Sequence, residues 1–234
     1  MLHGPNTLNN STGLNLNCKY MKKIIYYVAL LFFFGCINAF GQTPAATSGI
    51  NNKTIQQKLD TATFAAGCFW CTEAKFQQLK GVVTVVSGFT GGHAVHPSYE
   101  EVCTGSTGHA EACNIIYDPS QISYDELLAA FFVAHDPTQL NRQGNDVGTQ
   151  YRSAIFYHNL TQKNKAIYYI NKLNEVKAYK SKIVTEVAPY TIFYKAENYH
   201  QNYYNLNPDQ AYCKYVIQPE LEKFKAVFKG KLKQ

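Results

Sequence analysis

The sequence lacks several features that would place it in other classes of protein. Its longest unbroken apolar run, residues 24–34, has 11 residues, well short of the roughly 20 that a membrane-spanning helix needs. No cluster of lysine and arginine interleaves with aromatic residues, as a groove that binds nucleic acid would require. No internal repeat is present. Hydrophobic residues make up 46% of the chain and charged residues only 16%, so a folded core is expected.

Residues 1–41 are predicted to form a leader. The charged start 21–23 before the apolar run, and the small residues within 39–41, are typical of a secretory signal peptide. Met21 is therefore the expected start, and residues 1–20 have no recognisable role. Lipid attachment at Cys36 is a less favoured alternative, because two phenylalanines precede it where small or aliphatic residues are usual. We expect an extracytoplasmic protein, periplasmic or secreted, after cleavage.

Removal of the leader changes both the charge and the cysteine count. The remaining 193 residues carry 19 basic and 16 acidic side chains, a balance of +3 rather than the +6 of the whole chain. An odd number of cysteines leaves at least one free thiol in an oxidising compartment, and a domain of this size needs no disulfide framework. Reactive sulfur chemistry is therefore expected. The five cysteines that remain are Cys68, Cys71, Cys103, Cys113 and Cys213.

The patterns of polar and apolar residues predict a linker over 42–58 and a single domain over 59–234. Strands and helices mix without a steady βαβ rhythm, which favours the α+β class, with a mixed sheet and helices packed on it. The predicted strands cover 61–66, 82–86, 110–117, 153–157 and 183–187. The predicted helices cover 69–79, 123–135, 161–179 and a closing segment that Pro219 opens.

Cys68 is the candidate nucleophile. It stands between a predicted strand and a predicted helix, so we expect it at the helix N-terminus. Free backbone N–H groups and the positive end of the helix dipole favour thiolate over thiol there, which would make Cys68 reactive near neutral pH. The neighbouring rings of Phe69 and Trp70 suggest that a small apolar substrate group docks beside the sulfur.

Glu111 is the candidate acid. Strand alternation places it on one face with Cys113 and Ile115. A carboxyl group held against apolar neighbours has a raised pKa and can donate a proton at neutral pH. An exposed glutamate at a strand end fits the residues equally well. Tyr99 and Asp146 carry no signal in isolation, since a packed aromatic and a turn residue would look the same.

Eight segments follow the order found in A-type peptide-methionine (S)-S-oxide reductases, and the chain resembles this family from about residue 63 to 225. These segments are 67–70, 88–92, 97–103, 107–111, 135–138, 142–146, 148–154 and 196–201. The resemblance implies a ferredoxin-like core and the reduction of methionine S-sulfoxide, protein-bound or free, to methionine. It also implies no metal or organic cofactor, and an external dithiol reductant such as thioredoxin.

The resemblance assigns a role to each candidate residue. It implies that Cys68 attacks the sulfoxide and becomes a sulfenic acid, while Glu111 protonates the sulfoxide oxygen. The other implied site residues are the phenols Tyr99 and Tyr151 that bind this oxygen, the loop carboxylate Asp146, and Phe69 and Trp70 as the pocket for the methionine methyl group.

The thiol that resolves the sulfenic acid is left open. Cys71 stands where many relatives have glycine, and the tail lacks a glycine-rich segment with a further cysteine. Cys213 matches a position that resolves in some relatives, so it is favoured over Cys71. Direct reduction of the sulfenic acid is a third alternative. Cys103 and Cys113 are expected to be buried structural thiols.

Two functions from other classes stay open at this point. Cys68 and Cys71 could join His93 and His96 in a zinc-binding module, because both pair spacings suit tetrahedral ligation. Alternatively, the strand, the Cys-x-x-Cys pair and the helix could form a thioredoxin-like dithiol exchanger. The aromatic residues between the cysteines count against the zinc module. The missing βαβ context counts against the dithiol exchanger. A monomer that binds no nucleic acid is expected.

Overall fold

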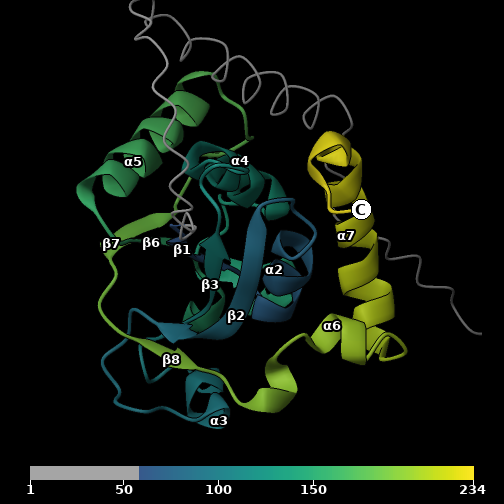
Figure 1. Ribbon diagram of the computed structural model, residues 1–234. Helices are drawn as coiled ribbons and strands as arrows, with labels where there is room; N and C mark the ends of the chain where they lie inside the picture. The colour runs from purple at the N-terminus through teal and green to yellow at the C-terminus, as the bar shows by residue number, and fades with distance from the viewer. Residues whose placement is uncertain (1–57) are drawn as a thin grey trace, which may run out of the picture.

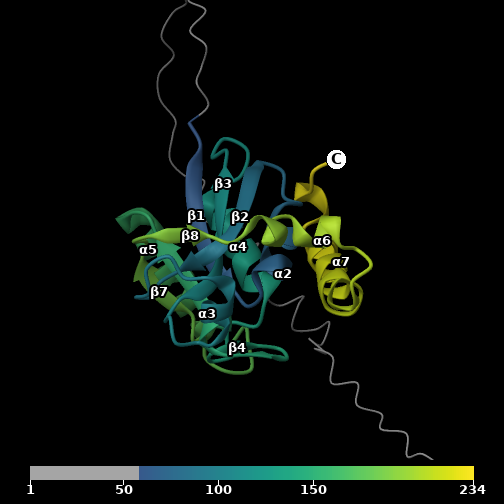
Figure 2. The same ribbon diagram turned by 90° about the horizontal axis from the view of Figure 1, so that it is seen from below.

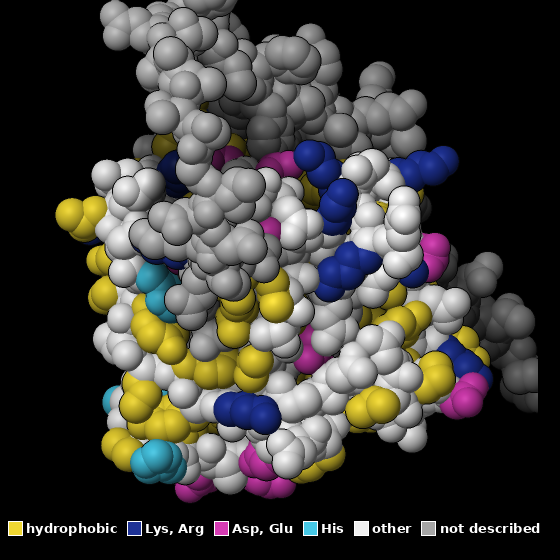
Figure 3. Space-filling model, in the orientation of Figure 1, with side chains coloured by type: hydrophobic (Ala, Val, Ile, Leu, Met, Phe, Trp, Pro, Cys, Tyr) yellow, Lys and Arg dark blue, Asp and Glu magenta, His cyan; other side chains and the backbone are white. Residues whose placement is uncertain are grey.

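The computed structural model describes residues 58–234. The predicted leader and all but the last residue of the predicted linker lie outside the described residues. Among the described residues, none of the helices combines the length and the apolar character needed to cross a bilayer. On the face shown in Figure 3, basic side chains are scattered among apolar and acidic ones.

A six-stranded sheet, in the order β7-β6-β1-β3-β2-β8, forms the centre of the molecule (Figure 1). All neighbours pair antiparallel except β6 and β7, which are parallel, so the predicted mixed sheet is confirmed. The strands are β1 (Asp60–Ala66), β2 (Val82–Thr90), β3 (Ala110–Tyr117), β6 (Ser153–Tyr157), β7 (Glu186–Pro189) and β8 (Phe193–Lys195), and a separate hairpin joins β4 (Arg142–Gln143) to β5 (Asp146–Val147).

Four of these strands and two helices form the ferredoxin-like core that the resemblance implies. Along the chain, β1, α2, β2, β3, α4 and β6 follow one another, and in the sheet β3 lies between β1 and β2. This is the split βαβ arrangement of ferredoxin-like domains. The helices are α2 (Phe69–Phe76), α3 (Tyr99–Cys103), α4 (Tyr124–Ala134), α5 (Leu160–Glu175), α6 (Tyr203–Leu206) and α7 (Gln218–Val227), with short 3₁₀ helices at Thr149–Tyr151, Asn198–His200 and Lys229–Lys231.

The main core lies between the sheet and the helices α2 and α4. Phe64 of β1 contacts Phe76 of α2 and Phe131 of α4, with ring centroids 5.8 and 5.0 Å apart. Each such ring contributes roughly 1.5–3 kcal/mol when it is fully buried. Helix α7 lies along the outer side of α2 in both views (Figure 1, Figure 2). Helix α2, which follows β1, is therefore packed between the sheet on one side and α7 on the other.

Most predicted elements are found, several with different boundaries, and three of these differences have local reasons. Helix α5 ends at Glu175 rather than 179, because Lys177 takes a left-handed conformation with φ 50°. Strand β7 begins at Glu186 rather than 183, because the N–H of Ile183 donates to the Asn174 side chain instead of to a strand. A π-helical turn, Cys213–Ile217, precedes α7, so the helical path begins before Pro219.

Candidate active site

Cys68 lies in the turn between β1 and α2, where it is the N-cap residue of the helix. The preceding Gly67 has φ 85°, and a Cβ atom there would come within 2.6 Å of the Gln143 side chain. Only glycine fits such a position without strain. The predicted location of Cys68 at a helix N-terminus is confirmed, and its side chain is buried, with 7% exposed.

The protonation state of Cys68 differs from the expectation. Burial raises the pKa of the Cys68 thiol well above its usual value, and the neighbouring Cys71 and Glu111 raise it further, while the polar side chain of Tyr212 lowers it. Loss of hydration therefore outweighs the helix N-terminus. Cys68 is a thiol at neutral pH in this structure, and its proton has to leave as it reacts.

Glu111 projects from β3 toward the start of α2. Its carboxylate oxygen Oε2 accepts a hydrogen bond of 2.9 Å from the backbone N–H of Phe69, and the side chain is only 1% exposed. Burial raises the pKa of Glu111 from 4.5 to about 8; the Phe69 N–H works in the opposite direction, and the charge of Asp146 adds to the rise. The predicted burial of Glu111 is confirmed, and the alternative of an exposed glutamate is wrong.

Two phenols lie near Glu111. Tyr99 begins α3, and its N–H donates to the Glu197 carboxylate at 3.2 Å. Tyr151 ends the short helix after the β4–β5 hairpin. Burial, followed by the charge of Glu111, raises the pKa of both tyrosines. Both hydroxyls therefore stay protonated and can donate hydrogen bonds next to a protonated carboxyl group.

Phe69 and Trp70 lie in an aromatic cluster next to Cys68. Phe69 is buried, and its ring is 6.3 Å from that of Tyr99 and nearly parallel to it. Trp70, the only tryptophan of the chain, stacks on Tyr203 with centroids 3.7 Å apart. Its indole N–H donates to Nδ1 of His200 at 3.2 Å. The indole is therefore fixed in position by two contacts, one on its face and one at its edge.

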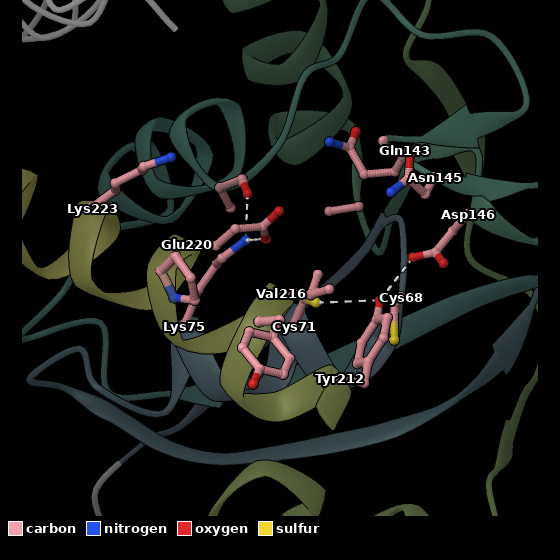
Figure 4. A pocket seen from close by; sticks show the side chains of 15 residues that line it. Cys68, Cys71, Lys75, Gln143, Asn145, Asp146, Tyr212, Val216, Glu220 and Lys223 are labelled. Carbon is pink, nitrogen blue, oxygen red and sulfur yellow. Dashed lines mark hydrogen bonds and ion pairs between the residues drawn. The ribbon is translucent and has the colours of Figure 1, made fainter. Parts of the chain in front are cut away.

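A pocket of about 220 Å³ opens on the other side of Cys68 (Figure 4). One wall is the β4–β5 hairpin with Gln143, Asn145 and Asp146, and the opposite wall is formed by α7 and the end of α2. In that wall the buried Lys75 forms an ion pair of 2.7 Å with Glu220. The free volume beside Cys68 is thus bounded by amide and charged groups.

Cys71 and Tyr212 line the floor of this pocket together with Cys68. The Tyr212 hydroxyl donates to Oδ2 of Asp146 at 2.7 Å, and Sγ of Cys71 lies 3.8 Å from the same hydroxyl. Asp146, which the resemblance assigned to the sulfoxide site, makes its one side-chain hydrogen bond to a described residue here. Its charge also raises the pKa of Glu111. Asp146 therefore lies between the Glu111 side of the site and the pocket that Cys71 and Tyr212 line.

Cys213 does not line this pocket with Cys68. Its side chain is fully buried in the π-helical turn before α7. Burial, followed by the nearby Cys71, raises the pKa of the Cys213 thiol. Cys213 therefore lies near Cys71 but outside the pocket that Cys68 and Cys71 share. All five cysteines of the described residues are free thiols.

The two cysteines expected to be structural differ from one another. Cys113 is completely buried, as predicted, and its thiol donates to the Phe69 carbonyl at 3.6 Å. Cys103 is exposed, so the expectation for it is wrong. It ends the short helix α3, which leaves its side chain at the rim of the site, where its sulfur interacts with the Tyr99 hydroxyl.

Sequence reasoning gave no role to three residues at the site, Tyr212, His200 and Glu197. His200 and Glu197 belong to one of the segments that carry the family resemblance, which was the available signal. Nε2 of His200 and Oε2 of Glu197 are buried, lie 3.7 Å apart, and have no hydrogen-bond partner among the described residues. Tyr212 had no signal except its position next to Cys213.

The zinc alternative lacks a site in the described part of the chain. No group of three or more histidine, cysteine, aspartate or glutamate side chains in residues 58–234 is arranged to hold a metal ion. The proposed combination of Cys68 and Cys71 with His93 and His96 is therefore not assembled.

Comparison with known proteins decides the family. The family model described as peptide methionine sulfoxide reductase matches residues 60–232. The chain belongs to this family. It is 56% identical over 163 residues to the peptide methionine sulfoxide reductase MsrA of Nautilia profundicola, which covers 70% of this chain and 92% of the relative. It is 50% identical over 175 residues to the MsrA of Saccharolobus solfataricus, and this match covers 75% of this chain and 98% of the relative.

Solved structures of the family share the fold. The reduced form of Mxr1 from Saccharomyces cerevisiae is 35% identical, with a TM-score of 0.63 over 68% of this chain and 91% of that one. Methionine sulfoxide reductase A of Corynebacterium diphtheriae is 39% identical, with a TM-score of 0.61 over 69% of this chain and 80% of that one. The A-type resemblance is confirmed.

The raised pKa of Glu111 predicts a pH-dependent stability. The native protein keeps this proton up to about pH 8, whereas the unfolded chain loses it near the ordinary value of 4.5. The native state then binds the extra proton, so the contribution of Glu111 to wild-type stability falls by about 1.4 kcal/mol for each pH unit between these values. We expect the stability of Glu111→Gln relative to wild type to rise over this interval and to level off above pH 8.

Urea unfolding from pH 4.5 to pH 9 measures this difference, with Glu100→Gln, an exposed glutamate of α3, as the control. A stability difference between Glu111→Gln and wild type that does not change with pH would show that Glu111 ionises normally in the native protein.

Proposed function

We propose that this chain reduces methionine S-sulfoxide to methionine, both in proteins and as the free amino acid. The observation that carries the proposal is the buried Glu111, whose pKa of about 8 keeps it protonated at neutral pH next to the helix that Cys68 begins. A sulfoxide oxygen is a strong hydrogen-bond acceptor, and a neutral carboxyl group with two phenol hydroxyls can hold it while charge develops there. Relatives of 50% and 56% identity that are named for this reaction support the proposal.

In the first step, the sulfur of Cys68 attacks the sulfoxide sulfur while Glu111 gives its proton to the oxygen. The thiol proton of Cys68 passes to Glu111, because burial disfavours a preformed thiolate. The sulfur–sulfur bond of the resulting intermediate then breaks as the hydroxyl group moves to Cys68. Methionine leaves reduced by two electrons, and Cys68 becomes a sulfenic acid.

The substrate is fixed at three points, which accounts for a preference for one epimer. Phe69 and Trp70 would take the methyl group, the Glu111 side would hold the oxygen, and Cys68 would meet the sulfur. Exchanging oxygen and methyl would put an unpaired polar atom against the rings, which is costly. We therefore propose the S epimer, as the family resemblance implies.

In the second step, we propose that Cys71 attacks the sulfenic acid and forms a disulfide with Cys68, with loss of water. Support comes from the shared pocket of Cys68 and Cys71 and from their i, i+3 spacing at a helix start, where side chains are neighbours. Cys213, favoured from the sequence, would act after Cys71, because it lies near Cys71 but outside the shared pocket. An external dithiol of the thioredoxin type would then reduce the disulfide by exchange.

We also propose that the protein acts as a monomer outside the cytoplasm. The support for the location is the signal-like pattern of residues 21–41. The reductant would then have to be available in that compartment.

Substitutions at Cys68 and Glu111 test the first step. We expect Cys68→Ser to abolish methionine formation, because a hydroxyl group cannot form the sulfenic acid. Glu111→Gln should keep activity within about tenfold because an amide still donates, whereas Glu111→Ala should lose about 10²–10⁴-fold. Methionine formed from the S-sulfoxide is the measurement, with Glu100→Gln as control. Retained turnover in Cys68→Ser, or equal losses in the two Glu111 variants, would contradict the mechanism.

Thiol counts after one turnover identify the resolving cysteine. Without reductant, wild type should lose two thiols for each methionine formed, and Cys213→Ala should still lose two. Cys71→Ala should lose only one and leave Cys68 as a sulfenic acid that dimedone labels, because Cys213 lies outside the pocket. Loss of two thiols in Cys71→Ala, with only one lost in Cys213→Ala, would instead favour Cys213 as the direct partner.

A further inference from the structure

A chain of hydrogen bonds joins Cys71 to Asp146 through Tyr212 (Figure 4). The Tyr212 hydroxyl donates to Asp146 at 2.7 Å, and the sulfur of Cys71 lies 3.8 Å from the hydroxyl oxygen. A tyrosine hydroxyl has a single hydrogen, and Asp146 accepts it, so the thiol of Cys71 is the donor to Tyr212. A proton can therefore pass from Cys71 to Asp146 by two transfers along existing hydrogen bonds.

We propose that Tyr212 is a catalytic residue that carries the proton of Cys71 to Asp146 when Cys71 closes the disulfide with Cys68. This inference rests on the proposed function. The sulfur of Cys71 forms a bond to the sulfur of Cys68, and the bond between that sulfur and its hydroxyl oxygen breaks. The Cys71 proton moves to Tyr212 as the Tyr212 proton moves to Asp146. Asp146 then protonates the departing hydroxide, which leaves as water.

The surroundings of Cys71 leave the Tyr212 hydroxyl as the route for its proton. Cys71 is buried, and its sulfur is in hydrogen-bond contact with that hydroxyl. Lys75, the one cation of α2 that lines this pocket among the described residues, is paired with Glu220 and also donates to the carbonyl of Ala134. The relay through Tyr212 therefore supplies the base that takes the proton as the disulfide forms.

Both relay groups are held in place by their own elements. The ring of Tyr212 meets the edge of Trp70 with centroids 6.0 Å apart, in a T-shaped contact. Asp146 lies on β5, whose pairing with β4 fixes the hairpin across the pocket. Burial raises the pKa of Asp146 from its usual value, which makes the carboxylate a better proton acceptor. The geometry is therefore present before any substrate binds.

The test follows two events in one turnover of the full chain without reductant: formation of methionine and loss of the second thiol. The variants are Tyr212→Phe and Asp146→Asn, which keeps an acceptor for Tyr212 but cannot take the proton. The control is Tyr215→Phe, from the same helical turn; its side chain is exposed, and its hydroxyl makes no hydrogen bond to a described residue. Fluorescence of the single Trp70 checks that each variant keeps its fold.

We expect Tyr212→Phe to form methionine within about threefold of the wild-type rate but to lose the second thiol about tenfold to hundredfold more slowly. Asp146→Asn should slow the second event by a similar factor, and Tyr215→Phe should match wild type. Wild type that forms no methionine would overturn the proposed function itself. Methionine formation with wild-type thiol loss in Tyr212→Phe and Asp146→Asn, or a disulfide mapped to a cysteine other than Cys71, would overturn the relay alone.

Discussion

The hydrogen bond from the Phe69 N–H to the buried carboxyl of Glu111 is the contact on which the site depends. It joins the first turn of α2 to the middle of the sheet, so the nucleophile and the acid are fixed relative to one another by β1, β3 and the turn at Gly67. Placing a carboxyl group there is costly if it is charged. The protein meets that constraint by keeping it protonated, which is also what acid catalysis requires.

Cys68 faces two environments that suit two successive reactions. Glu111, Tyr99 and Tyr151 supply hydrogen-bond donors for an oxygen atom, and the aromatic cluster around Phe69 supplies an apolar surface. On the other side, Cys71, Tyr212 and Asp146 form a hydrogen-bonded series that ends in a carboxylate. Because Cys68 lies at the N-terminus of α2, its sulfur can take part in both the oxygen transfer and the formation of the disulfide without a large movement.

Periodic parts of the structure could be predicted from the sequence. Strand β3 has the predicted limits, and α4 begins where the sequence predicted, with Ser123 as its N-cap. Alternation on β3 placed Glu111 on one face with Cys113 and Ile115, but it could not decide between a buried and an exposed carboxyl group. The segment around Tyr212 could not be predicted, because short turns and a π-helical turn have no simple period. The pKa of Cys68 was misjudged because helix position is local, whereas burial depends on every element around it.

The central claim is that Glu111 is a neutral acid in the native protein at pH 7. Infrared difference spectra between the native wild type and Glu111→Gln, recorded from pH 5 to pH 10, test it directly. The account predicts a protonated-carboxyl band that is present at pH 7, absent from the variant, and lost with a midpoint near pH 8. A carboxylate signal from Glu111 already at pH 6 would contradict it.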